Sequence, residues 1–287
     1  MSKYTDFIGS ASQMDEIVFF NDSANIVTLD DDKVYLRGGV FEDDLTVYPD
    51  ANNRFKYLTE SFRVASQDTI PTDITWDGTY FWVVGTSTDS VYKYNAFGVY
   101  QNVSFNVASE DTSPTGITWD GTYFWVLGDG TNSVYKYNAS GVYQSVSFSV
   151  ASEDATPIGI AWDGTYFWVV GRSTNSVYKY NASGVYQSVS FSTLSQDNYP
   201  GGIAWDGTYL WVVGGNSQSV YKYNASGAYQ SVSFSVASEE TSPRGISFDG
   251  TSLWVIGYFT DAVYKYADVN GIIANTSFGA HNYVRVK

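Results

Sequence analysis

The chain has 287 residues, of which 18% are aromatic, and it contains no cysteine. Its 30 acidic and 15 basic residues give a formal net charge of −15, which argues against binding to the phosphate backbone of nucleic acids. Without cysteine there are no disulfides and no thiolate metal sites. No apolar stretch approaches the ~20 residues of a membrane span, and the first residues lack the pattern of a secretory signal peptide. We therefore expect a protein that does not insert into membranes and is not exported by itself.

Residues 26–68 resemble a degenerate copy of a unit that is clear later in the chain. The segment from Ile26 parallels the segment from Asp73 with one added residue, and Phe62 lies 43 residues before Phe105. The fit is good at the end of this segment and poor at its start. It is therefore either an additional copy of the unit or a separate N-terminal module.

Five clear copies follow at a constant spacing of 43 residues, without insertion or deletion. Each contains a version of the sequence WDGTYFWVVG. The first aromatic residues of these sequences are Trp76, Trp119, Trp162, Trp205 and Phe248, and the second are Trp82, Trp125, Trp168, Trp211 and Trp254. A period of this length is typical of propellers and solenoids.

Each copy contains four short runs that are typical of β-strands. In the second copy they are GITW, TYFWVLG, SVYKYN and GVYQSVSF. The Asp-Gly pair between the first two runs predicts a two-residue hairpin with a type I′ turn, and NASG predicts the turn between the last two. The second run is apolar at successive positions, as expected for a strand that is covered on both faces.

These features predict an all-β fold, a β-propeller of four-stranded antiparallel blades. We favour six blades, with 26–68 as the degenerate one; the alternative is five blades plus an N-terminal module. The predicted propeller spans 26–287, with Ile272–Phe278 as the strand that closes the ring. Its repeats are 69–111, 112–154, 155–197, 198–240 and 241–280, followed by a tail at 281–287.

The copies differ from one another mainly in two sets of loops. In a blade, the loop before the first strand and the loop between strands two and three open on one face. These segments vary between copies, whereas the turns on the opposite face are nearly constant. The variation is explained either by drift of surface loops or by a partner-binding face. In the second case the candidate ligand-binding residues are Arg172, Arg244, Tyr258 and Phe259, which can supply charge-assisted hydrogen bonds or aromatic contacts.

No motif in the sequence predicts catalysis, a metal site or a cofactor. The Asp of each WDGT stretch precedes Gly in a tight turn, which favours a structural role over a ring of metal ligands. A Ser-His-Asp site would depend on His281 alone, and the innermost runs offer only Asp73 as an acid. Residues 30–32 (DDD) and 42–44 (EDD) are interpreted as solvated hairpin ends, with Ca²⁺ binding as an alternative. The Asn-x-Ser triplets at Asn102, Asn138, Asn181 and Asn224 are interpreted as turn residues rather than glycosylation sites.

The N-terminal part of the chain resembles a known class of proteins. Residues Lys33–Ala51 resemble a stretch found in tail-fibre and other virion proteins of tailed bacteriophages; Gly38 departs from the small hydroxyl residue expected after arginine. The residues that carry the likeness are Tyr35, Leu36, Arg37, Gly39, Tyr48, Pro49 and Ala51. The repeats from Ser61 also resemble arrays attached to such modules. The resemblance implies a component of a virion that assembles in the host cytoplasm, joined to other virion proteins through its N-terminal segment, with 1–25 as an attachment arm.

Three functions are compatible with this reading. The first is a non-enzymatic phage protein whose variable face recognises a glycan or protein on the host surface, as a single chain or an oligomer. The second is a purely structural or decorating virion protein. The third is a six-bladed propeller hydrolase, which the lack of asymmetric acidic, His or Asn residues on the innermost runs argues against.

Overall fold

The computed structural model describes residues 16–19, 28–30, 33–35, 55–268 and 283–286. All secondary structure in these ranges is β, so they contain no helix that could cross a membrane. The chain divides into two compact units, Phe55–Asp268 and a second unit made of Met1–Arg54 with Val269–Lys287.

The second unit contains two short antiparallel pairs. Strand β1 (Glu16–Phe19) pairs with β24 (Tyr283–Val286), and β2 (Thr28–Asp30) pairs with β3 (Lys33–Tyr35). His281, residues 42–44 and most of 1–25, for which the sequence makes predictions, lie outside the described residues.

The unit Phe55–Asp268 is a β-propeller of five four-stranded antiparallel sheets. The innermost strands are β5 (Pro71–Trp76), β9 (Pro114–Trp119), β13 (Pro157–Trp162), β17 (Pro200–Trp205) and β21 (Pro243–Phe248). The second strands are β6 (Phe81–Gly85), β10 (Tyr123–Gly128), β14 (Tyr166–Gly171), β18 (Tyr209–Gly214) and β22 (Leu253–Gly257). The third strands are β7 (Ser90–Tyr94), β11 (Ser133–Asn138), β15 (Ser176–Asn181), β19 (Ser219–Asn224) and β23 (Ala262–Asp268). The outermost strands are β8 (Tyr100–Asn106), β12 (Tyr143–Ser149), β16 (Tyr186–Ser192), β20 (Tyr229–Ser235) and β4 (Phe55–Arg63).

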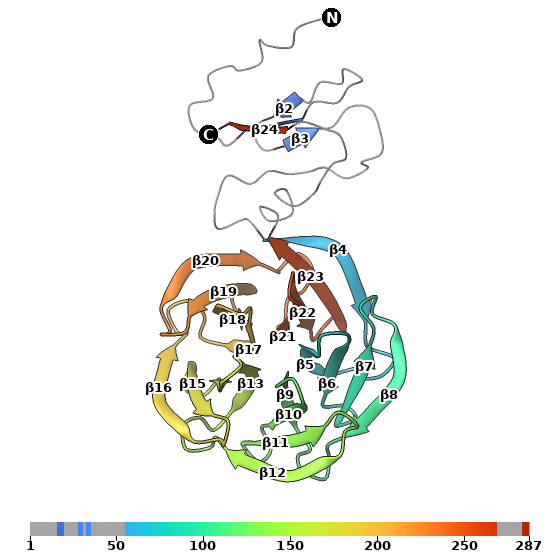
Figure 1. Cartoon of the computed structure of the whole chain (residues 1–287), viewed down its shortest axis with the longest axis vertical. Helices are drawn as coiled ribbons and strands as arrows, with labels where there is room; N and C mark the ends of the chain where they lie inside the picture. Colours follow the sequence, from blue (N-terminus) through green and yellow to red (C-terminus); the bar gives the residue numbers. More distant parts are fainter. Residues whose placement is uncertain (1–15, 20–27, 31–32, 36–54, 269–282, 287) are drawn as a thin grey trace, which may run out of the picture. The chain divides into compact units, whose positions relative to one another are not determined.

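The five blades surround a central axis, with their first strands innermost and their fourth strands at the rim (Figure 1). Every residue of the second strand β6 is buried, whereas every residue of the outermost strand β8 is half-buried or exposed. This agrees with the apolar second runs of the sequence, because a strand packed between two neighbouring blades needs apolar side chains on both faces.

The ring is closed by strand β4, which comes before the first blade in sequence but belongs to the fifth. It pairs with β23 in the register Val263 to Phe62 and Tyr264 to Ser61. The prediction of six blades is therefore wrong, and the five-blade alternative is confirmed. Ile272–Phe278, the predicted closing strand, lies outside the described residues, and β4 occupies the place predicted for it.

The sequence of 26–68 explains why a sixth blade is predicted. Its likeness to a repeat is real at its end, because β4 is a true fourth strand and shares the irregularity of the others. Each fourth strand carries one non-glycine residue with a φ of 54 to 60°: Thr59, Asn102, Ser145, Ser188 and Ser231. A segment that supplies only a fourth strand resembles a degenerate blade in sequence, but it does not add a blade to the ring. Asn102 is thus a residue within a strand, not in a turn.

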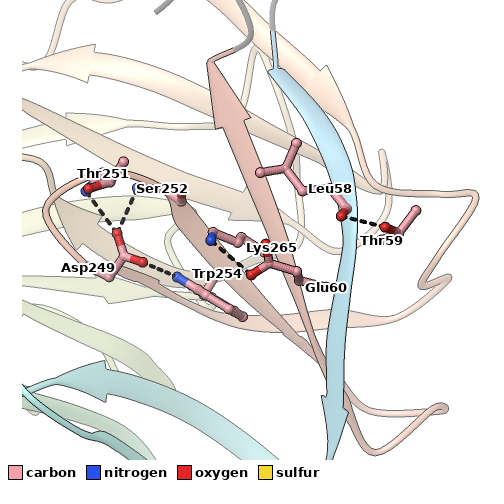
Figure 2. A network of polar contacts seen from close by, with 8 residues as sticks. All are labelled: Leu58, Thr59, Glu60, Asp249, Thr251, Ser252, Trp254 and Lys265. Atoms are coloured by element: carbon pink, nitrogen blue, oxygen red, sulfur yellow. Dashed lines mark hydrogen bonds and ion pairs between the residues drawn. The ribbon is translucent and has the colours of Figure 1, made fainter. Parts of the chain in front are cut away.

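Two substitutions occur together at the closure. In the first four blades the third-strand lysine lies over a tyrosine ring, as Lys136 does over Tyr123 at 3.7 Å. In the fifth blade serine replaces that tyrosine, and Lys265 Nζ instead pairs with Glu60 Oε2 of β4 at 2.9 Å (Figure 2). The equivalent residue in the first blade is Val103. The ion pair joins two strands that are about 200 residues apart and fits the closing register alone.

The hydrophobic core consists of clusters between neighbouring blades. The cluster at the closure joins Phe62, Phe81 and Trp254 from the fifth and first blades. Phe81 packs against Trp254 with 4.7 Å between ring centroids, and the equivalent pair Phe124 and Trp82 lies at 4.6 Å. The closing interface is therefore packed like the others.

Candidate functional site

The propeller has two faces, and the loops on one of them vary more between the copies than the turns on the other. The turns between strands one and two, and between three and four, form what we call the uniform face. The loop before the first strand and the loop between strands two and three form the variable face. Because the structure confirms the predicted strand order in each blade, the sequence differences between copies do gather on one face.

On the uniform face, both carboxylate oxygens of the aspartate in each WDGT stretch accept hydrogen bonds that stabilise the hairpin. Asp120 Oδ1 accepts hydrogen bonds from the backbone N–H groups of Thr122 and Tyr123, at 2.8 and 2.7 Å, and its Oδ2 accepts one from Trp125 Nε1 at 2.7 Å. The same indole bond recurs in every blade, as Figure 2 shows for Asp249 and Trp254. The predicted structural role is confirmed, and the clamp on the second tryptophan explains why the two residues recur together.

The predicted type I′ turn is wrong. Asp120 N–H donates to the carbonyl of Tyr123, so Gly121 and Thr122 are the central residues. Only Gly121 has positive φ, +97°, whereas type I′ needs it at both positions. Glycine at the first central position is the arrangement of a type II′ turn.

The second turn of the uniform face is as predicted. Asn138 Oδ1 accepts hydrogen bonds from the N–H groups of Ser140 and Val142 at 3.0 and 2.9 Å. Gly141 has a φ of +76°, and a Cβ on it would overlap the side chain of Phe105 in the preceding blade. Both reasons favour glycine at this position.

On the variable face, half of each loop is also constrained. Buried Asp111, 4% exposed, accepts hydrogen bonds from both N–H and Oγ1 of Thr131, the third residue of its loop. The fourth residue, Asn132, has a φ of +52°. Equivalent acids are Asp68, Asp154, Asp197 and Glu240. The first residue of each loop makes no hydrogen bond to its acid, whereas the second residue does so in the first and third blades, through Ser87 and Ser173. Three of the four predicted ligand-binding residues, Arg172, Tyr258 and Phe259, stand at these first two positions and make no hydrogen bond to the acid.

The structure places the four predicted residues on the fold as follows. The Arg172 guanidinium lies over the ring of Tyr199 at 3.7 Å, and its Nε donates to the Pro200 carbonyl at 3.4 Å. The Arg244 guanidinium lies 4.7 Å from the ring centroid of Tyr258. Three of the four predicted residues therefore belong to two arginine–tyrosine pairs, whose fourth member, Tyr199, is not among the predicted residues.

Phe259 extends the second pair. Its ring lies 5.3 Å from that of Tyr258, and its side chain is 70% exposed. Tyr199 could have been found from sequence, because it stands where the other copies have Ile70, Ser113, Thr156 and Ser242.

The two arginines lie on either side of one short segment of the fourth blade. Arg172 contacts Pro200, and a Cβ on the next residue, Gly201, would come within 2.5 Å of the Arg244 carbonyl oxygen. Burial lowers the pKa of Arg172, and the charge of Arg244 lowers it further, against the opposing effect of Tyr199.

Neither arginine is neutralised by a direct ion pair. In the described part of the chain no carboxylate lies within 4.0 Å of either guanidinium. Arg244 Nε is buried and has no hydrogen-bond acceptor there. Burial raises the pKa of Asp129, and the charge of Arg172 opposes that rise.

The centre of the propeller is closed by backbone and one carboxyl group. Four innermost strands carry glycine at the same position: Gly116, Gly159, Gly202 and Gly245. A Cβ on Gly202 would lie 2.7 Å from the Cα of Gly245, so these strands approach too closely for side chains. The first blade has Asp73 instead, 1% exposed, whose Oδ2 accepts a hydrogen bond from Ile117 N–H at 3.0 Å. Burial raises the pKa of Asp73 well above its usual value, although backbone N–H groups of three blades oppose the rise.

A cavity of about 170 Å³ lies on the axis toward the uniform face. Its walls repeat from blade to blade, and they include the half-buried residues Trp76, Trp119, Trp162, Trp205 and Phe248. These rings also pack within their own blades, as Trp119 does against Phe124 at 4.5 Å. We interpret them as structural.

In the described ranges no group of three or more His, Asp or Glu side chains is arranged to hold a metal ion. The acid that the sequence singled out on the innermost strands, Asp73, is enclosed by backbone.

Comparisons with known proteins bear on the fold alone. No family model and no curated protein matches this chain. Among solved structures, glutaminyl cyclase from Myxococcus xanthus is similar at a TM-score of 0.57 and 8% identity, over 81% of this chain and 97% of that one. A virginiamycin B lyase from Staphylococcus aureus is similar at a TM-score of 0.46 and 18% identity, over 69% of this chain and 66%, slightly under two thirds, of the lyase. A chain of a nidogen/laminin complex is similar at a TM-score of 0.48 and 12% identity, over 67% of this chain and 74% of that one. At 8% identity the likeness to the glutaminyl cyclase concerns the fold alone, and one fold can host many functions.

Proposed function

We propose that the chain is a non-enzymatic recognition protein of a bacteriophage particle, associated with the tail or fibre, that contacts the host surface through its variable face. The observation that carries the proposal is the contrast between the two faces. The repeats keep the side chains that hold the turns of the uniform face, and they differ most in the loops of the variable face.

The distribution of variation favours recognition over drift. Positions of equal freedom exist on the uniform face, where Thr122 is exposed and its side chain makes no hydrogen bond to the described residues. That threonine is nevertheless repeated in every copy. Drift alone would alter both faces, whereas selection for a varied contact surface alters one.

A catalytic role is not part of the proposal. Asp73 is enclosed and its carboxylate is bonded to backbone N–H groups, so it cannot reach a substrate in this conformation. The resemblance of Lys33–Ala51 to phage virion proteins supports attachment to a particle through the N-terminal segment. The alternative, a purely structural or decorating virion protein, makes no use of the arginine–tyrosine pairs.

The proposal is tested by binding of the purified, fluorescently labelled chain to bacterial cells and to an array of bacterial surface glycans. We expect the unmodified chain to bind and Phe259→Ser to bind more weakly, because the substitution removes an exposed aromatic side chain. The fold should tolerate serine, because Ser87 occupies the equivalent position in the first blade. The matched control is Thr122→Ala on the uniform face, which should bind as the unmodified chain does. Absence of binding to every cell and glycan, or equal loss in both variants, would contradict recognition through the variable face.

A further inference from the structure

The two arginines of the variable face are not needed by the fold. Positions equivalent to Arg244 hold Thr72, Thr115, Ile158 and Gly201 in the other blades, and those equivalent to Arg172 hold Thr86, Asp129, Gly215 and Tyr258. Thr72 and Thr115 use their hydroxyls to bridge to the carbonyls of the next blade, at 2.9 and 3.0 Å. Arginine makes no such bond at this position through its Nε, which is left without an acceptor.

The placement of the arginines is costly in the isolated chain. Arg172 Nε contacts the Pro200 carbonyl, and the backbone carbonyl of Arg244 lies by Gly201. Both side chains are half-buried, their like charges interact, and no carboxylate of the described residues contacts them. A buried N–H donor without a partner loses its hydration and gains nothing in return. An anion bound between the two guanidinium groups would relieve both costs.

Aromatic side chains surround the same position. Tyr199 lies under Arg172 and Tyr258 lies by Arg244, which holds each guanidinium in a fixed orientation. Planar guanidinium groups bind carboxylates through paired hydrogen bonds. The exposed ring of Phe259 adds an apolar surface, and the negative face of an aromatic ring attracts the polarised C–H groups of a sugar.

We propose that Arg172 and Arg244 together bind the carboxylate of an acidic saccharide, with Tyr258 and Phe259 against its sugar ring. This inference rests on the proposed recognition function and names the ligand class of its site. In a chain of net charge −15, such a site selects an acidic glycan through a local cluster of positive charge, although the protein as a whole repels anions.

The test is isothermal titration of the full chain with three carboxylated saccharides: oligogalacturonate, hyaluronan oligosaccharide and polysialic acid. Methyl-esterified oligogalacturonate, which lacks the charge, and inorganic phosphate are the comparison ligands. We expect at least one acidic saccharide to bind, its affinity to fall with added salt, and the methyl ester to bind at least roughly tenfold more weakly.

Arg172→Gln and Arg244→Gln should each lower the affinity for the acidic saccharide roughly tenfold. Lys136→Gln is the control, since it removes one positive charge from the third strand of the second blade. Thermal unfolding of each variant establishes that it is folded. The proposal is overturned if no acidic saccharide binds, if the methyl ester binds equally well, if both arginine variants bind as the unmodified chain does, or if phosphate alone binds.

The same variants separate this proposal from the broader one. If the unmodified chain binds bacterial cells and the arginine variants bind them equally well, the acidic-saccharide site is wrong and surface recognition stands. If acidic saccharides bind through the arginines but no bacterial surface does, the site stands and the host-recognition function is wrong.

Discussion

The two faces of this propeller are built from the same 43-residue unit, yet they carry different kinds of information. On the uniform face, repeated polar side chains hold the turns, as Asp120 does through its hydrogen bond to the Trp125 indole. On the variable face, Asp111 and Thr131 anchor the loop, whereas the first residue of the loop differs between copies and makes no hydrogen bond to that acid. Comparison of the copies therefore separates residues that fold the blade from residues that are available for contacts.

The largest effect should come from removing the strand that closes the ring. A chain that begins at Val64 lacks β4, which leaves the edge of β23 unpaired and exposes the cluster that Phe62 covers. We expect this shortened chain to show no cooperative thermal transition when its unfolding is followed by circular dichroism. A chain that begins at Phe55 keeps β4 and should unfold cooperatively. Equal melting curves for the two chains would contradict the closure.

On the uniform face, Asp120→Ala should destabilise the protein by about 3 kcal/mol, because it leaves the buried indole N–H of Trp125 and two backbone donors without their acceptor. Urea denaturation measures the difference. Thr122→Ala in the same turn should change stability by less than about 0.5 kcal/mol. A loss for Asp120→Ala as small as that would show that the clamp is dispensable.

On the variable face, Asp89→Asn should stabilise the protein at pH 7 by up to about 1 kcal/mol. The equivalent residue in the second blade is Asn132, whose amide nitrogen, once the amide is flipped, donates to the carbonyls of Asp129 and Ala155. A carboxylate cannot donate such bonds, and one carboxylate oxygen of Asp89 is buried without a hydrogen-bond partner. The reciprocal change, Asn132→Asp, should destabilise by a similar amount.

The effect of Asp89→Asn should depend on pH. Burial raises the pKa of Asp89, and the charges of Asp111 and Asp68 raise it further. A carboxyl group with a raised pKa binds its proton more tightly in the folded state, so its contribution to stability is most favourable below the unfolded pKa of about 3.9 and declines as pH rises through the folded pKa. The advantage of the Asn variant, measured by thermal unfolding, should therefore be present at pH 7 and shrink toward pH 3.5. An advantage that grows on acidification would contradict this assignment.

The smallest effect is expected at the closing ion pair. Glu60→Val gives β4 the residue that Val103 supplies in the first blade, and it should change stability by less than about 0.5 kcal/mol, because Glu60 is 57% exposed. A double-mutant cycle with Lys265→Met measures the coupling. A coupling above about 1 kcal/mol would mean that the pair contributes substantially to stability.

Most of the blade could be predicted from sequence, because strand periodicity and turn residues are local. The places of Trp119, Asp120 and Asn138 followed from the spacing alone. The number of blades did not, because a strand that closes a ring from the other end of the chain looks like the end of a degenerate repeat. Phe62 and Phe105 have the same 43-residue spacing whether or not a complete blade lies before Phe62.

The candidate site was predicted in part for a similar reason. Arg172, Arg244, Tyr258 and Phe259 could be found because they differ from their counterparts in other copies. The approach of Arg172 and Arg244 to Pro200-Gly201 could not be predicted, because residues 72 positions apart come together only through the curvature of the ring. Tyr199 differs from its counterparts as well, and its role became evident only with the guanidinium of Arg172 over its ring.

The assignment of loops to two faces depends on a closed ring of five blades, and amide hydrogen exchange of the full chain tests it most directly. We predict that residues 55–63 are protected to the same degree as Tyr100–Asn106, since both are outermost strands paired along one edge. If residues 55–63 exchange as fast as an unpaired segment while Tyr100–Asn106 remains protected, the fifth blade lacks its outer strand and the ring is not closed as described.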